Sequence, residues 1–289
     1  MISKVANYLP SVGNLLRYTE ALPINKITKI AFGCLALTGG AYGAVRLLRK
    51  ANYIGESLWT LHALAWLDNA QAQMRLAEKY ETGNGVKVDQ KLSTQMFQKA
   101  LKNGSADAQL IVGDIFADAK KFGEAFKYYE MAAAQGNAQA LYRVGVCYNF
   151  GEGVAQDYLK AINSLKKAEE MGNVACYCII SELYLNGEGR VPQDYKLAME
   201  YAEKARANGD IFGCLLLAHI YYIGLGIEKN EQRSRQFHAE AAKGNPALAF
   251  ESAVQLEKSH VQEAKVLYQL LAAGGHAKAA ERLKEFPSQ

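Results

Sequence analysis

A segment that ends in glycine recurs along this chain about every 36 residues, and this period constrains the fold more than any single side chain. Residues 69–104, 137–172, 173–209 and 210–244 each read as an apolar helix, a Gly-x-Gly loop, an Asp or Asn, a second helix and a closing Gly. Residues 105–136 and 245–275 keep the helices and the closing Gly but shorten the loop. Because a two-helix unit cannot bury its apolar face alone, the repeat predicts an all-α fold, a right-handed α-solenoid of stacked helix hairpins.

Three positions of each first helix recur four residues apart and therefore share one helical face. Counted from the first residue of a unit, position 4 is small, position 8 is aliphatic and position 12 is aromatic. In the third unit these are Ala140, Val144 and Tyr148. We expect the small residue where two helices approach closely and the aromatic residue at the base of the helix pair, so this pattern indicates a core.

The ends of the helices also carry a repeated signal. A closing glycine supplies the left-handed conformation that ends a helix, and the Asn, Ser or Asp after it caps the next helix. The closing glycines near the repeated second-helix alanines are Gly104, Gly136, Gly172, Gly209 and Gly244. The Gly-x-Gly loops follow no predicted strand and precede no Lys-Ser/Thr pair, which excludes a phosphate-binding loop.

The third unit shows the pattern most fully, as Asn137-Ala138-Gln139-Ala140, Gly145, Tyr148, Gly151-Glu152-Gly153-Val154, Asp157, Ala161, Ala168 and Gly172. This pattern resembles the Sel-one-like repeat, a relative of the tetratricopeptide repeat, and the resemblance covers about residues 69–275. The second and sixth units depart from it, with residues 117–121 and 257–260 in place of the glycine loop, and we expect tighter hairpins there. The resemblance implies a protein that assembles complexes, often at membranes. Relatives linked to β-lactam-like compounds carry a disulfide in every unit, which this chain lacks.

The predicted organisation has four parts. Residues 1–50 form a basic N-terminal segment, residues 51–68 an N-terminal cap helix, and residues 276–289 a C-terminal cap helix. Between the caps lie six repeats, at 69–104, 105–136, 137–172, 173–209, 210–244 and 245–275.

The N-terminal segment is apolar and basic. It carries seven Lys or Arg against one acidic residue, whereas the rest of the chain has 26 basic and 28 acidic residues. A mildly acidic solenoid argues against nucleic-acid binding. Residues 27–48 would span roughly 33 Å as a helix, enough to cross a bilayer if Lys29 and Arg46 reach the interfaces, and the flanking charges favour a cytoplasmic solenoid. The alternatives are a cleaved secretory signal, an organelle presequence and a buried hairpin packed on the first cap.

The sequence gives no sign of catalytic, cofactor or metal chemistry. The five histidines fall in different parts of the chain without ligand spacing, and we expect each of them at a helix surface or a cap. They are His62, His219, His238, His260 and His276. The five cysteines, Cys34, Cys147, Cys176, Cys178 and Cys214, complete no zinc pattern and favour a reducing compartment. We therefore expect no enzyme activity, no cofactor and no metal.

A second stripe on the first helices, at positions 6, 10 and 13, is the candidate partner-binding surface, because first helices face the concave side in such solenoids. Its residues are Tyr142, Val146, Asn149, Cys178, Glu182, Leu185, Leu215, His219 and Tyr222. The open alternative is that curvature of the solenoid covers these side chains. The favoured function is a membrane-anchored scaffold or adaptor for a partner protein or peptide. The alternatives are a secreted bacterial effector acting at host membranes, and a soluble hydrolase or small-molecule binder.

Overall fold

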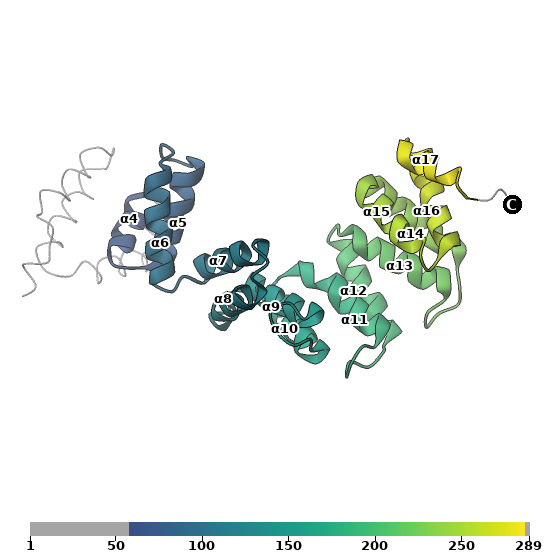
Figure 1. Cartoon of the computed structure of the whole chain (residues 1–289), viewed down its shortest axis with the longest axis horizontal. Coiled ribbons are helices and arrows are strands. Elements are labelled where there is room, and N and C mark those ends of the chain that lie inside the picture. The colour runs from purple at the N-terminus through teal and green to yellow at the C-terminus, as the bar shows by residue number, and fades with distance from the viewer. Residues whose placement is uncertain (1–57, 287–289) are drawn as a thin grey trace, which may run out of the picture. The chain divides into compact units, whose positions relative to one another are not determined.

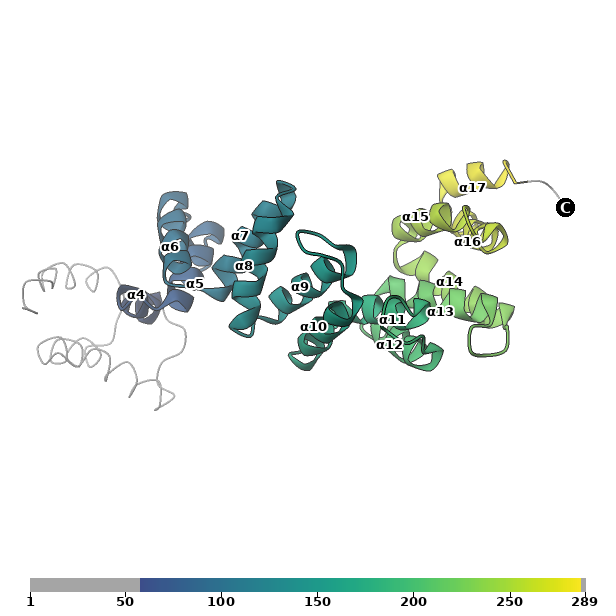
Figure 2. The ribbon, with the colours of Figure 1, turned by 60° about the horizontal axis from the view of Figure 1, so that its bottom comes forward.

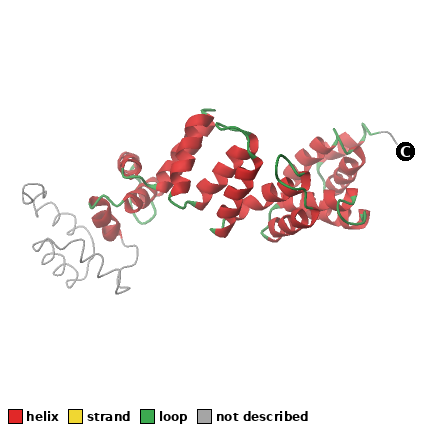
Figure 3. Ribbon diagram, turned by 90° about the horizontal axis from the view of Figure 1, so that it is seen from below, coloured by secondary structure: helices red, strands yellow, loops and turns green. Residues whose placement is uncertain are grey.

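A computed structural model describes residues 58–286 of the chain, and these fall into two compact units that divide between Gly104 and Ser105. Every element of the described part is a helix (Figure 3), which confirms the all-α class. In the first unit, α4 (Leu58–Trp66) packs on α5 (Ala70–Thr82), which forms a hairpin with α6 (Gln90–Lys102). The contact between α4 and α5 buries Leu61, Ala65, Ala72 and Leu76.

The second unit continues with hairpins that follow one another in chain order (Figures 1 and 2). Its helices are α7 (Ala106–Asp118), α8 (Phe122–Ala134), α9 (Ala138–Phe150), α10 (Tyr158–Glu170), the 3-10 turn η3 (Val174–Cys176) with α11 (Tyr177–Asn186), α12 (Tyr195–Ala207), α13 (Ile211–Ile223), α14 (Glu231–Gly244), α15 (Pro246–Leu256), α16 (Val261–Ala273) and α17 (Ala277–Leu283). Odd-numbered helices from α5 to α15 are the first helices of the hairpins, and even-numbered helices are the second.

Side-chain caps fix where the helices begin. In the third unit, the side chain of Asn137 accepts a hydrogen bond from the Ala140 amide at 2.9 Å, and Asp157 accepts one from the Lys160 amide at 3.0 Å. Gly151 ends α9 in the left-handed conformation, with φ of 72°. The repeated Asn and Asp residues therefore cap the starts of the helices, and the repeated glycine ends them, as the sequence predicted.

The expectation for Gly244 is wrong. This glycine lies inside α14 and does not adopt a positive φ, unlike Gly104, Gly136, Gly172 and Gly209. Asn245 follows at once in an extended conformation and caps α15, accepting from the Leu248 amide at 3.1 Å, with Pro246 at the first turn. Because Asn245 both ends α14 and starts α15, no left-handed turn is needed between them.

Small side chains set the spacing of the helices. Position 4 is buried in the units that begin at 69, 105, 137, 173 and 210, as predicted. In the last of these, a Cβ on Gly213 would lie 2.7 Å from the Ala202 carbonyl oxygen of the preceding α12. Position 9 acts within a hairpin, since a Cβ on Gly145 would lie 2.7 Å from Leu165 Cγ of the facing α10. The residues at position 9 are Ala77, Gly113, Gly145, Ser181 and Ala218, and all of them are buried.

The position-12 aromatic residues pack against aromatic side chains of the second helices. Tyr184 stacks on Tyr201 of the same hairpin with 6.2 Å between ring centroids, and Tyr221 stacks on Phe237 at 5.7 Å. Tyr148 instead meets Phe126 of the preceding hairpin edge to face, at 5.3 Å. Tyr184 is buried in the core, as the spacing predicted, and Tyr148 and Tyr221 are half-buried and pack against it.

The second glycine of the Gly-x-Gly loop packs against the preceding hairpin. A Cβ on Gly153 would lie 2.1 Å from the carbonyl oxygen of Phe122, the first residue of α8. A Cβ on Gly226 would lie 2.5 Å from Cβ of Tyr195, the first residue of α12. The loop of one hairpin thus rests on the start of the preceding second helix, and a side chain there would push the two apart.

The predicted membrane helix at residues 27–48 lies outside the described residues, as does Cys34. Within residues 58–286, none of the helices has both the length and the apolar character that crossing a bilayer requires.

Substitution of Gly153 tests this inter-hairpin contact. Gly209 is the matched control, because it has a similar φ (80° against 74°) but no atom within 4 Å of the place that an added Cβ would take. Left-handed strain should cost both alanine variants roughly 1–2 kcal/mol of unfolding free energy. We expect Gly153→Ala to lose roughly 1–3 kcal/mol more from overpacking, measured by urea unfolding followed by circular dichroism. Equal losses in the two variants would contradict the contact.

Candidate functional site

In the second unit, the first helices α11 and α13 of two neighbouring hairpins come together, and they approach each other more closely than α12 approaches α14. Charged side chains bridge the second helices of the same two hairpins, as in the Arg206–Glu240 ion pair at 3.2 Å. Between the fifth and sixth hairpins the second helices are in direct contact, and α14 packs on α16.

The predicted partner-binding residues of α9 and α11 differ in exposure. Tyr142, Val146 and Asn149 are half-buried, and Tyr142 packs against the core formed by α10, α11 and α12. Cys178 and Leu185 are buried. The predicted stripe is therefore partly covered by neighbouring hairpins along α11.

Two residues of α11 on this stripe have polar surroundings. The Cys178 thiol donates to Asp210 Oδ2 at 3.2 Å, which links α11 to the cap of α13. The Glu182 side chain reaches solvent, yet the surrounding protein raises the pKa of its carboxyl, mainly through desolvation and then through Glu188.

The predicted residues of α13 lie near a second group of polar side chains. Leu215, His219 and Tyr222 are half-buried. His219 Nδ1 lies 2.9 Å from Oε2 of Glu263, in the first turn of α16, and its ring meets the His260 ring edge to face with 4.8 Å between centroids. His238 Nε2, from α14, lies 3.5 Å from Oε1 of the same carboxylate. We call these four residues, His219, His238, His260 and Glu263, the histidine–carboxylate cluster.

Burial and charge oppose each other at Glu263. The carboxylate is fully buried, and this desolvation alone would raise its pKa. The contacts with His219 and His238 together outweigh desolvation and hold the pKa below the usual range of a glutamate. The start of α16 adds to this effect, because a helix N-terminus favours negative charge.

The expectation that every histidine lies at a helix surface or a cap is wrong for His238, which is fully buried. It faces the Glu263 carboxylate because α14 packs on α16. Sequence reasoning missed the cluster because its members lie on three helices and have no ligand spacing along the chain. One signal was present, since His238 occupies the place in its helix that Leu165, Ala202 and Tyr268 occupy in theirs, and these three residues are buried.

The cysteines of the described residues are all buried and free. Desolvation is the main cause that raises their pKa values, to about 11 for Cys147 and Cys176 and to about 12 for Cys214. Protonated, buried thiols are poor nucleophiles and poor metal ligands. The group with metal-ligating geometry among residues 58–286 is instead His219, His260 and Glu263, whose ligand atoms lie within 4.8 Å of one another.

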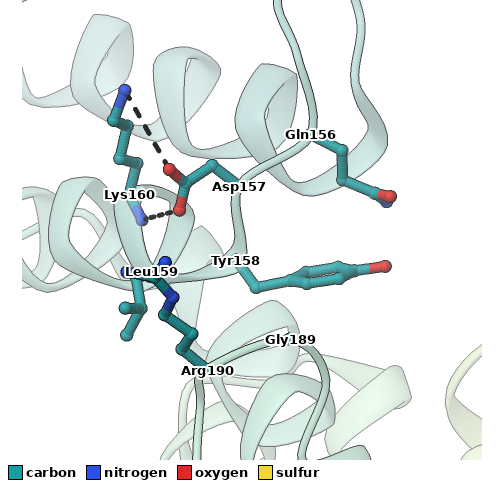
Figure 4. A pocket seen from close by; sticks show the side chains of 7 residues that line it. All are labelled: Gln156, Asp157, Tyr158, Leu159, Lys160, Gly189 and Arg190. Atoms are coloured by element: carbon teal, nitrogen blue, oxygen red, sulfur yellow. Dashed lines mark hydrogen bonds and ion pairs between the residues drawn. The ribbon is translucent and has the colours of Figure 1, made fainter.

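A cavity beside the hairpin loops offers no comparable chemistry (Figure 4). Its lining comes from the start of α10 and from the loop that carries Gly189 and Arg190. Asp157, the acid in this lining, is engaged as the cap of α10 and in a 4.0 Å ion pair with Lys160. The Tyr158 ring covers Gly189, so this surface serves the contact between hairpins.

Curated relatives match parts of the chain. Chitin synthase regulatory factor 3 of Schizosaccharomyces pombe is 30% identical over 135 residues, which is 44% of this chain and 14% of that protein. The ERAD-associated E3 ubiquitin-protein ligase component HRD3 of Candida glabrata is 30% identical over 95 residues, 32% of this chain and 11% of that protein. The chain thus spans only a small part of the length of these relatives.

Solved structures show the same architecture over most of the chain. A protective antigen of uropathogenic Escherichia coli that displays an SLR fold is 25% identical, with a TM-score of 0.59 over 86% of this chain and 56% of that one. A Sel1 repeat protein from Oxalobacter formigenes is 27% identical, with a TM-score of 0.57 over 74% of this chain and 90% of that one.

The family model of the Sel1 repeat matches residues 70–105, 111–137, 138–173, 174–210 and 211–246, more than half of the sequence. These matches coincide with the hairpins from α5 to α14, and the resemblance drawn from the third unit is confirmed. The chain belongs to the Sel1 repeat family.

Proposed function

We propose that this chain is a non-enzymatic scaffold or adaptor that binds a partner protein or peptide through the first helices α9, α11 and α13. The observation that carries the proposal is a set of half-buried side chains on the first helices of the third and fifth hairpins, at Tyr142, Leu215 and Tyr222, with the exposed Glu182 on the hairpin between them. Half-buried aromatic side chains provide contact area at low entropic cost, which makes them frequent anchors of protein interfaces. Because these side chains lie on helices, the spacing between those that share a helix is fixed.

The known relatives support a role in assemblies. By name, one is a regulatory factor of chitin synthase and another is a component of a ubiquitin ligase. Both names describe proteins that act together with other proteins. Because the family model matches the repeats, they are the part of this chain that we expect to make such contacts.

We further propose that residues 27–48 anchor the solenoid to a membrane, with the repeats on the cytoplasmic side. This proposal rests on the sequence of the segment, which is apolar between Lys29 and Arg46 and is followed by Arg49 and Lys50. Juxtamembrane basic residues favour retention on the cytoplasmic side.

Photo-crosslinking in the native cell tests the partner-binding face. A photoreactive phenylalanine analogue at Tyr142 or Tyr222 should give one or more discrete adducts of higher mass in the full-length chain. The matched control places the same analogue at Lys167, which is exposed on the second helix α10. We expect the adducts from Tyr142 and Tyr222 to be missing or at least about tenfold weaker at Lys167, because anchors concentrate at the interface centre.

Substitution then tests whether those adducts report binding. Glu182→Ala in the chain that carries the analogue at Tyr222 should weaken the adduct while leaving the helical circular dichroism unchanged. The proposal fails if Lys167 gives the same adducts as the stripe, or if a purified partner binds the Tyr142→Ala and Tyr222→Ala variants as tightly as it binds the parent chain.

Carbonate extraction of the full-length chain tests the membrane anchor. The parent chain should stay in the membrane pellet, and a variant with Leu35→Arg and Leu37→Arg should move to the supernatant. Each arginine near the centre of a membrane helix opposes insertion by roughly 2.5–3.5 kcal/mol. A matched Leu58→Arg and Leu64→Arg variant, changed in α4 instead, should remain in the pellet. Extraction of the parent chain itself would contradict the anchor.

A further inference from the structure

The histidine–carboxylate cluster contains buried polar atoms that the described protein leaves unsatisfied. Oε1 of Glu263 and Nε2 of His238 are buried without a hydrogen-bond partner, although they lie 3.5 Å apart. A buried carboxylate with unused acceptor capacity costs free energy unless a cation or a donor reaches it. His238 thus faces the carboxylate oxygen of Glu263 that is not in contact with His219.

The geometry brings three ligand atoms together. The side chains of His219, His260 and Glu263 each offer one ligand atom, and these atoms lie within 4.8 Å of one another. Ligand bonds of about 2.0–2.2 Å in a tetrahedral zinc site place ligand atoms roughly 3.3 Å apart. A contraction of at most about 1.5 Å would complete such a site.

His260 is the residue that can make this movement. It is half-buried at the junction of α15 and α16, and its side chain makes no capping hydrogen bond to α16. Besides its ring contact with His219, it makes a local 2.9 Å hydrogen bond between its Nδ1 and Oγ of the neighbouring Ser259. This contact leaves Nε2 of the ring available as a ligand.

The donor set selects the class of cation. Two imidazoles with one carboxylate suit zinc and similar transition metals, whereas calcium and magnesium prefer all-oxygen sites. His238 is placed to support the ligating carboxylate from its other oxygen, in the way that partners of metal ligands orient them. Ser234 Oγ lies 3.5 Å from the far ring nitrogen of His238 and helps to hold its ring.

We propose that His219, His260 and Glu263 bind one divalent transition-metal ion, with His238 orienting the carboxylate. The ion would join α13 to α16 at the place where the sixth hairpin has lost its glycine loop. Three protein ligands leave one position of a tetrahedral ion for water or for a group from a partner. This inference is independent of the proposed partner-binding role.

Zinc binding by the full-length chain tests the proposal. After treatment with a chelator and its removal, calorimetric titration with Zn²⁺ should show a site of one ion per chain that His260→Ala and Glu263→Gln each weaken at least tenfold. Zn²⁺ at 100 times its dissociation constant should raise the unfolding temperature of the second unit by roughly 5–10 °C. His260→Ala is the key variant, because it leaves the buried contacts among His219, His238 and Glu263 in place.

His276→Asn is the matched control. It removes another half-buried histidine but keeps a side chain that can cap α17, where the His276 ring now accepts from the Ala279 amide at 3.3 Å. This variant should bind Zn²⁺ as the parent does. Cobalt substitution should give a visible spectrum typical of nitrogen and oxygen ligands, without the charge-transfer bands of thiolate ligands.

Three results would overturn the proposal. The first is a parent chain that neither binds Zn²⁺ nor gains stability from it, which would make the cluster a hydrogen-bonded network of protein groups alone. The second is unchanged binding by the His260→Ala variant. The third is a cobalt spectrum with thiolate bands, which would place the ion at a cysteine.

Discussion

The close approach of helices at small residues is the constraint on which the rest of the structure depends. Position 4 of a first helix meets the preceding second helix, and position 9 meets the second helix of its own hairpin. Gly213 and Gly145 show the two contacts, because even a methyl group at either position would overlap the facing helix. Because the helices approach this closely, the larger residues at positions 8 and 12 interdigitate. The apolar area that each hairpin buries therefore depends on its neighbours.

One of the two units that depart from the repeat, the sixth, is the one with unusual chemistry. The sixth hairpin lacks the Gly-x-Gly loop, and its α16 packs on α14 of the preceding hairpin. This packing brings Glu263 into a fully buried place between His219 and His238. In our proposals the periodic hairpins provide the face for a partner, whereas the irregular one provides the side chains that bind a cation.

The sequence predicted the helices, the caps and the core because each of these depends on residues within one period. Ala140, Val144 and Tyr148 follow from a spacing of four, and Asn137 and Asp157 from capping preferences. Exposure of the predicted stripe could not be predicted in the same way. Whether Cys178 is buried or Tyr142 half-exposed depends on how far each hairpin is rotated relative to the preceding hairpin. That rotation is set by packing between the repeat units. The histidine–carboxylate cluster is a contact across two hairpins, so a pattern read within single units does not contain it.

The most direct test of the close-approach constraint compares two helical glycines. Gly213 lies at an interface, where an added Cβ would be 2.5 Å from the Arg206 backbone nitrogen, whereas Gly123 near the start of α8 has open space around it. Alanine favours a helix over glycine by roughly 0.8–1.0 kcal/mol. Urea unfolding should therefore show Gly123→Ala more stable than the parent chain and Gly213→Ala less stable. Stabilisation by both substitutions would contradict the account, because the helices would then have room to spare.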